Sequence, residues 1–323
     1  MFDLRAHTVL LVVGGSRAYG IHTEASDVDL KGCCVPPPAF FHGFLRTFEQ
    51  QDDPAQMASF VDLLTGDEAA AARAVGLEGT VYGIRKLLRL GVKSNPNIFD
   101  LLFCREREVR WSTPIGDQIR SARDLFLSQR AHDAFAGYAT AQLKRMQTHR
   151  GWLLHPPAAR PERADFGLPD APVSVPDRTV PLSGALIEAL KRERSFQSAM
   201  RGHQQYTHWL RSRNPERAAL EARFGYDTKH GAHLVRLLRM GVEILSTGTV
   251  HVWRGPGGPD DAGELRAIRA GAWSYDALMD WAASQQAALS AAREFGSALP
   301  AQPDREAVDR LCVALVEAAL SGS

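Results

Sequence analysis

Two aspartates one residue apart, Asp27 and Asp29, are the residues of this 323-residue chain that are best suited to chemistry. Side chains alternate along a strand, so an Asp-x-Asp pair on a strand faces one side of the sheet. Two carboxylates so close together repel each other unless a cation lies between them. Oxygen ligands of this kind suit Mg²⁺ with bound phosphate. Asp27 and Asp29 are therefore predicted to be metal ligands and catalytic residues.

A Gly-Gly-Ser turn precedes the two acids and follows an apolar run, residues 8–13, that is typical of a strand. Backbone N–H groups and a hydroxyl in such a turn can bind phosphate. Gly15 and Ser16 are therefore predicted to contact the phosphates of a nucleotide.

Two cations next to these motifs are predicted to bind phosphate as well. Arg17 can form a bidentate contact with a phosphate, although a surface ion pair with Glu24 or Asp27 is the alternative. Lys31 lies on the same face of the strand as the two aspartates. It can either balance their charge or reach a triphosphate.

The order strand, Gly-Ser, a spacer of about ten residues and Asp-x-Asp resembles the DNA polymerase β-type nucleotidyltransferase superfamily, with Gly15, Ser16, Asp27 and Asp29 as the matching residues. The longer strings Gly-Ser-Arg-Ala-Tyr-Gly and Ser-Asp-Val-Asp are similar to one branch of predicted bacterial and phage nucleotidyltransferases. The resemblance implies NMP transfer that depends on two Mg²⁺ ions, or on Mn²⁺ in their place. In-line displacement at phosphorus requires such cations to neutralise the developing charge.

A third carboxylate from a neighbouring strand usually completes such a site, and Glu78 is the first candidate. It precedes a β-prone run, residues 79–82, and the resemblance places an acid four residues before Tyr82. Related chains usually carry Asp there, so Glu78 is a departure from the pattern. Asp67 and Glu68 are the next candidates, and a solvated acid at a strand start is the alternative for Glu78.

A second string that resembles the same family runs from Gly225 to Arg239. Within it, Lys229, His233 and Arg236 are spaced i, i+4 and i+7, which places them on one face of a helix. We expect this face to bind the triphosphate or an RNA backbone. The alternative is that these polar groups only tie two domains together.

Composition is ordinary for a globular protein, and no apolar run approaches the ~20 residues of a membrane span. Cys33, Cys34, Cys104 and Cys312 lack metal-ligand spacing. Free thiols and the absence of a signal peptide predict a cytoplasmic protein without membrane contact. The overall charge is near zero, but residues 191–240 hold eleven Lys or Arg against four acids. This excess favours a polyanion-facing surface, with local ion pairing as the alternative.

The chain is expected to be α+β, with a small mixed sheet flanked by helices and then a mainly helical part. Strands are predicted over 8–14, 27–35 and 79–82, and helices over 16–22, 84–92, 115–154 and most of 183–323. A short strand or hairpin arm is expected over 249–253. The expected domains are a catalytic domain (1–110), a Pro-rich connecting region (111–182) and a helical domain (183–323) that binds nucleotide or RNA.

These observations predict a nucleotidyltransferase that uses ATP or another NTP, adds the NMP to a hydroxyl and releases pyrophosphate. RNA is the first acceptor considered, in repair or end modification, and a small molecule or a protein hydroxyl is the alternative. A protein that keeps the fold as a non-catalytic nucleotide or RNA sensor is the alternative of another class. Which base is transferred, whether a template is used and the oligomeric state do not follow from the sequence.

Overall fold

The computed structural model describes residues 2–157, 159–174 and 183–321, which form two compact units. One unit combines Met1–Leu143 with Lys229–Ser323, and the other is Lys144–Thr228. The first unit contains the sheet and all residues predicted for the site. The domain boundaries at 110 and 182 remain a prediction.

Within the described residues the first unit is built on a five-stranded mixed sheet of order β3-β4-β2-β1-β5. Strand β1 pairs antiparallel with β2 and β5, β2 pairs parallel with β4, and β3 pairs antiparallel with β4. The strand bounds are β1 Thr8–Val13, β2 Val28–Cys34, β3 Gln50–Gln51, β4 Leu77–Gly83 and β5 Val109–Ser112. The strands predicted over 8–14, 27–35 and 79–82 are confirmed.

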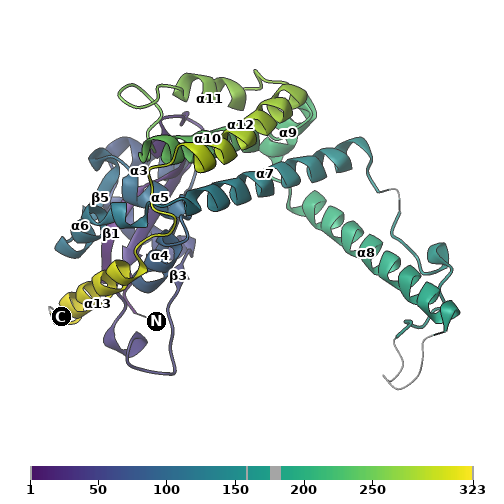
Figure 1. Ribbon diagram of the computed structural model, residues 1–323, viewed down its shortest axis with the longest axis horizontal. Helices are drawn as coiled ribbons and strands as arrows, with labels where there is room; N and C mark the ends of the chain where they lie inside the picture. The colour runs from purple at the N-terminus through teal and green to yellow at the C-terminus, as the bar shows by residue number, and fades with distance from the viewer. Residues whose placement is uncertain (1, 158, 175–182, 322–323) are drawn as a thin grey trace. The chain divides into compact units, whose positions relative to one another are not determined.

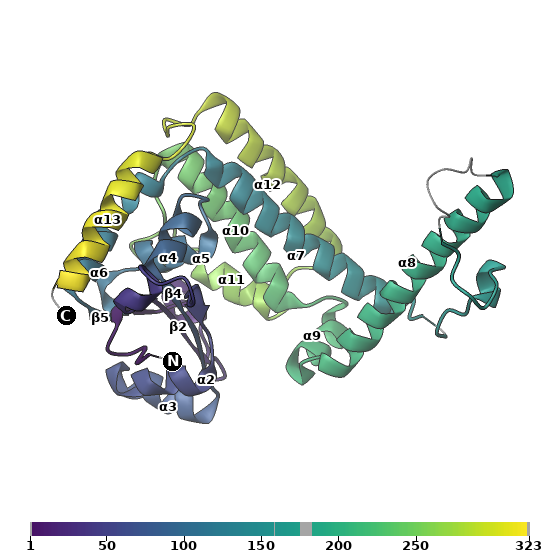
Figure 2. The ribbon, with the colours of Figure 1, turned by 90° about the horizontal axis from the view of Figure 1, so that it is seen from below.

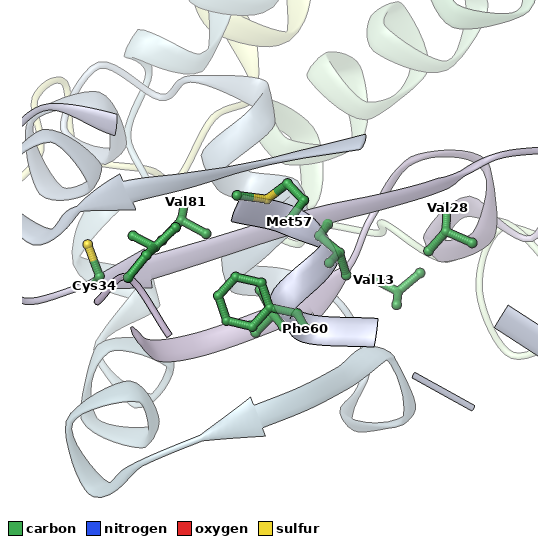
Figure 3. Close-up of a cluster of buried hydrophobic side chains, with 9 residues drawn as sticks. Val13, Val28, Cys34, Met57, Phe60 and Val81 are labelled. Carbon is green, nitrogen blue, oxygen red and sulfur yellow. The ribbon is translucent and has the colours of Figure 1, made fainter. Parts of the chain in front are cut away.

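One face of the sheet forms a hydrophobic core, and this fixes what lies on the other face. Val28, Leu30 and Cys34 of β2 are fully buried together with Met57 and Phe60, which follow the short strand β3 (Figure 3). Helices α2 (Pro54–Met57) and α3 (Gly66–Ala74) lie on this side of the sheet (Figure 2). Alternation along β2 therefore turns the odd-numbered side chains to the opposite face.

The opposite face is covered by helices whose ends the sequence specifies. Helix α4 (Ile84–Gly91) buries an apolar stripe, and α5 (Pro96–Phe103) begins where Asn95 accepts a hydrogen bond from the Asn97 N–H group. Asn at the N-cap followed by Pro is a strong helix start. Both helices lie on the side of the sheet away from α2 and α3 (Figure 2). The helix predicted over 84–92 is confirmed.

The rest of the first unit is helical, as Figure 1 shows. Helix α10 packs against α7 and α12, because Gly241 of α10 closely approaches Phe135 and Leu289. The bounds are α1 Gly15–Tyr19, α6 Pro114–Ser121, α7 Arg130–Leu154, α10 Thr228–Thr247, α11 Ala262–Arg269, α12 Tyr275–Phe295 and α13 Arg305–Ser321. The α+β class with a helical C-terminal part is confirmed.

The expected strand over residues 249–253 is wrong. Val250 and Val252 are buried, which accounts for the alternating pattern, but none of the described strands pairs with this segment. Its continuation instead makes isolated backbone contacts, with the Arg254 N–H group donating to the Tyr19 carbonyl at 3.1 Å. A turn follows at Gly255–Gly258, closed by a 3.0 Å hydrogen bond from the Gly258 N–H group to the Gly255 carbonyl.

The second unit consists of the end of α7, α8 (Gly184–Ser212) and α9 (Pro215–Phe224). The rings of Trp152, Tyr206 and Trp209 pack on one another, and the buried Glu221 carboxylate is paired with Arg213. No described helix of the chain is both long enough and apolar enough to cross a bilayer.

Candidate active site

The Gly-Ser turn and the second aspartate are in direct contact. The Gly14 N–H group donates to the Asp29 carbonyl at 2.8 Å, and Gly15 has a φ of +57°. A Cβ atom at Gly15 would lie 2.2 Å from the Asp29 Oδ2 atom. Only glycine tolerates both this backbone conformation and this approach. The turn is therefore shaped around the Asp29 carboxylate.

The three predicted acids lie on or next to one edge of the sheet face opposite the hydrophobic core, which we call the site face. Asp27 is exposed and Asp29 half-buried, whereas Val28 and Leu30 beside them are fully buried. Glu78 is the direct partner of Asp29 in the parallel β2–β4 register and is exposed. Partners in register place their side chains on the same face. The register thus places Asp29 and Glu78 side by side on one face, and Asp27 lies just before β2.

The electrostatics of Asp29 reflect this crowding. Burial raises the pKa of the Asp29 carboxyl, the Lys31 charge lowers it, and the charges of Asp27, Glu78 and Asp100 raise it further. A carboxylate surrounded by others is one whose ionised form a cation would stabilise.

The residues fit Mg²⁺ as a partial ligand set. Among the residues that the structure describes, no three His, Cys, Asp or Glu side chains converge closely enough to hold a metal ion by themselves. Mg²⁺ is commonly bound by one or two carboxylates, with water and substrate phosphate as the other ligands. Asp27 and Asp29, with the Asp29 carboxylate cradled by Gly15, match that chemistry, and Glu78 lies on the adjacent strand.

The other candidates for a third carboxylate are placed differently. Glu68 accepts hydrogen bonds from the Thr65 N–H group at 3.0 Å and from Arg110 Nε at 2.7 Å. It therefore caps α3 and pairs with β5. Asp67 is exposed in the first turn of α3. These contacts leave Glu78 as the acid adjacent to Asp29.

Lys31 joins the site face to a buried ion network centred on Asp100 of α5. Lys31 Nζ lies 3.0 Å from Asp100 Oδ2 and 3.3 Å from Asn97 Oδ1. Arg236 Nη1 of α10 lies 3.2 Å from the other oxygen, Asp100 Oδ1. Burial alone would raise the pKa of Asp100, but the charges of Lys31 and Arg236 lower it to about 2.

Two further side chains complete this network. The Tyr19 hydroxyl donates to Asp100, and the Arg236 guanidinium lies 3.8 Å from the centroid of the Tyr19 ring. The Arg236 Nη2 atom lies 3.2 Å from His233 Nδ1. Burial, and then the Arg236 charge, lowers the pKa of His233 to about 3, so the ring is neutral at pH 7. His233 and Arg236 thus support Asp100 from α10.

The remaining predicted phosphate ligands lie at different depths. Ser16 is half-buried in the first turn of α1, and Lys229 is half-buried one turn before His233. The Arg17 guanidinium donates to the carbonyls of Asp27 at 3.3 Å and Ser26 at 3.4 Å, so it supports the turn that carries Asp27. Arg236 is only 1% exposed, so it acts here on Asp100. Phosphate binding by these residues remains a prediction.

The roles of Tyr19 and Asp100 in the network were not predicted. A signal for Asp100 is nevertheless present, because it is the one charged residue of the otherwise apolar helix α5. Lone charges on apolar helices are rarely buried without a partner.

The site thus combines a strand, a Gly-Ser turn and a second strand that carries Asp29, with Asp27 just before it and Glu78 on the neighbouring strand. Residues 4–153 match the family model of RlaP, described as an RNA repair pathway DNA polymerase beta family. This segment, a little under half of the chain's length, is therefore similar to a DNA polymerase β-type nucleotidyltransferase family. Comparison with curated proteins and with solved structures gave no match.

Gly15→Ala should displace the Asp29 carboxylate. The left-handed conformation costs a residue with a Cβ about 1–2 kcal/mol, and the added methyl would overlap Asp29 Oδ2. We expect Mg²⁺-dependent ATP binding, measured by calorimetry, to weaken about tenfold or more, equivalent to about 1.4 kcal/mol. Gly66→Ala at the start of α3 is the matched control, because no atom lies within 4 Å of the position that its Cβ would take. Equal effects of the two substitutions would contradict the proposed cradle.

Asp100→Asn should destabilise the first unit, since it leaves two buried cations without their carboxylate. Breaking a buried pair costs about 3–5 kcal/mol, measured as the free energy of unfolding in urea at pH 7. The folded pKa of Asp100 lies below the unfolded value of ~3.9, so its contribution is complete above about pH 4 and is lost toward about pH 2. The difference between the two proteins should therefore shrink as the pH falls through this window.

Asp62→Asn provides the control for that experiment. Asp62 pairs with Arg5 on the surface, where 62% of its side chain is exposed. Its removal should change stability far less than removal of Asp100. A similar loss for both substitutions would show that burial of the Asp100 network is not what stabilises the fold.

Proposed function

We propose that the protein is a metal-dependent nucleotidyltransferase that transfers an NMP from an NTP to a hydroxyl group of RNA and releases pyrophosphate. The observation that carries this proposal is the contact between Gly15 and the Asp29 carboxylate, with Asp27 and Glu78 at the same edge of the sheet. The match of residues 4–153 to a DNA polymerase beta family supports the reaction class, and the description of that family as an RNA repair pathway family supports RNA as the acceptor.

The chain's own residues divide the work between positioning and proton transfer. Ser16 and the amides of the Gly-Ser turn would hold the β- and γ-phosphates. The acceptor oxygen forms a bond to the α-phosphorus while the bond to the β-phosphate bridge oxygen breaks, and pyrophosphate leaves. The proton of the acceptor hydroxyl passes to a carboxylate of the site, for which Glu78 is exposed and adjacent.

Mg²⁺, when bound by Asp27 and Asp29 with Glu78 nearby, would neutralise the charge that develops on the phosphate oxygens. Lys31 adds a fixed positive charge on the same face. Its ammonium group is held by Asp100, and although burial opposes protonation, the Asp100 charge raises the pKa of Lys31. Lys31 therefore stays charged at neutral pH and can orient a phosphate oxygen.

The second unit supports an RNA acceptor. Residues 144–228 hold fourteen Lys or Arg against nine Asp or Glu, whereas the rest of the chain holds twenty-four against twenty-eight. One face of α8 lines an open pocket of about 470 Å³ together with Arg160, and His203, His208 and Arg211 lie along it. A positive surface of this kind attracts a phosphate backbone.

A non-catalytic nucleotide sensor is the second candidate, and two features of the acids favour it. The carboxylates of the described residues do not form a group of three that could hold a metal ion, and Glu78 stands where related chains usually carry Asp. A sensor would bind an NTP without releasing pyrophosphate. A small molecule or a protein as acceptor would instead release pyrophosphate in the absence of RNA.

Asp29→Asn should reduce pyrophosphate release by more than about 100-fold, since it removes the charge that the Gly15 cradle surrounds. The assay supplies each of the four NTPs with Mg²⁺ and total RNA, and follows both pyrophosphate and the labelled NMP. Asp67→Asn, an exposed acid of α3, is the control and should leave turnover unchanged. An active Asp29→Asn protein would remove this site from consideration, and NTP binding without turnover in the unsubstituted protein would favour the sensor.

Arg160→Ala combined with Arg211→Ala should weaken RNA binding and flatten its dependence on salt. Each lost contact with single-stranded RNA lowers the slope of log affinity against log salt by ~0.7, so the double substitution should lower it by about 1.4. Fluorescence anisotropy with a labelled oligoribonucleotide measures the slope. Arg73→Ala, an exposed cation at the end of α3, is the control. An unchanged slope would exclude the α8 pocket from RNA binding.

A further inference from the structure

A pocket of the first unit lies at the end of β2 away from Asp29. It has a volume of about 690 Å³ and is lined by the segment that follows β2, by α4 and by α13. On β4 its nearest residue is Gly83, five residues beyond Glu78. At ~3.3 Å per residue this is about 17 Å along the strand. The groove, as we call this pocket, is therefore distinct from the carboxylate site.

The groove is electropositive. Its described lining residues include only two acids, Glu49 and Asp309, and the Glu49 carboxylate is already paired with Arg89 at 2.5 Å. Five cations line the same space: Arg85, Arg89, Lys93, Arg130 and Arg305. Cations gathered in a concave surface raise the local concentration of anions. The groove is thus suited to an anionic ligand.

The groove is also aromatic. Phe40 and Phe48 are held in edge contacts with each other and with Phe2, which fixes this wall. Phe41 is half-buried, and the Arg85 guanidinium lies 4.6 Å from the centroid of its ring. Because the Arg85 guanidinium covers one face of the Phe41 ring, a flat base can stack on the other face while the cation contacts the attached phosphate.

We propose that the groove binds a nucleotide unit, with its base against Phe41 and its phosphate near Arg85 and Arg305. The volume lies within the ~300–1,000 Å³ typical of small-molecule sites. A bare anion would leave the phenylalanine wall unused, and an apolar ligand would leave the cations unpaired. The nucleotide unit is either part of a single-stranded RNA or a free nucleotide. This proposal does not depend on catalysis at Asp29.

Binding to the full chain carrying Asp29→Asn tests the groove separately from the carboxylate site. The probes are a labelled hexameric oligoadenylate, ATP and inorganic tripolyphosphate, each titrated in EDTA. Arg85→Ala combined with Arg305→Ala should weaken binding of the oligonucleotide, of ATP or of both at least fivefold. Loss for the oligonucleotide alone identifies RNA as the ligand, and loss for ATP identifies a free nucleotide.

Phe41→Leu tests recognition of the base, because leucine keeps an apolar side chain but has no ring face. It should weaken oligonucleotide or ATP binding at least fivefold and leave tripolyphosphate binding unchanged. Arg310→Ala, on the same helix as Arg305 but outside the groove, is the charge-matched control and should have no effect. Melting temperatures verify folding. Unchanged affinities in both groove variants, or equal losses for tripolyphosphate and the nucleotides in Phe41→Leu, would overturn the proposal.

Discussion

The buried carboxylate of Asp100 is the constraint on which the site face depends. An isolated charge in the protein interior is very unfavourable, and it persists only with partners of opposite charge and with its hydrogen bonds satisfied. Asp100 is 1% exposed and has three partners: Lys31 and Tyr19 at one oxygen and Arg236 at the other. Because these partners come from three separate elements, burying one carboxylate fixes the relative positions of β2, α1 and α10.

This network connects parts of the chain that are far apart in sequence. Arg236 follows Asp100 by 136 residues, with the entire second unit between them. The string from Lys229 to Arg239, which resembles the nucleotidyltransferases, therefore belongs structurally to the first unit. A helix from the C-terminal half thus supports Asp100, the carboxylate that pairs with Lys31.

Local signals were sufficient to predict the core strands but not the contacts among charged groups. The alternation of Val28, Asp29 and Leu30 identifies both faces of β2, because a half-buried strand has period two. The burial of Arg236 depends on a partner in α5 that no local pattern reveals. The same limitation explains the error at residues 249–253, where Val250 and Val252 alternate for packing reasons without a neighbouring strand. None of the described strands lies beside this segment to form backbone hydrogen bonds with it.

The charge distribution of the site connects substrate binding to metal binding. Asp27, Asp29 and Glu78 are three acids on β4 and on or just before β2, and Lys31 is the cation of β2 beside them. Part of the Lys31 charge is already compensated by Asp100. Carboxylates on neighbouring positions of a partly buried site repel one another and also repel an approaching phosphate. Under the proposed function, an NTP is therefore expected to bind well only together with a divalent cation. Productive binding of an NTP then differs from binding of phosphate alone in its requirement for that cation.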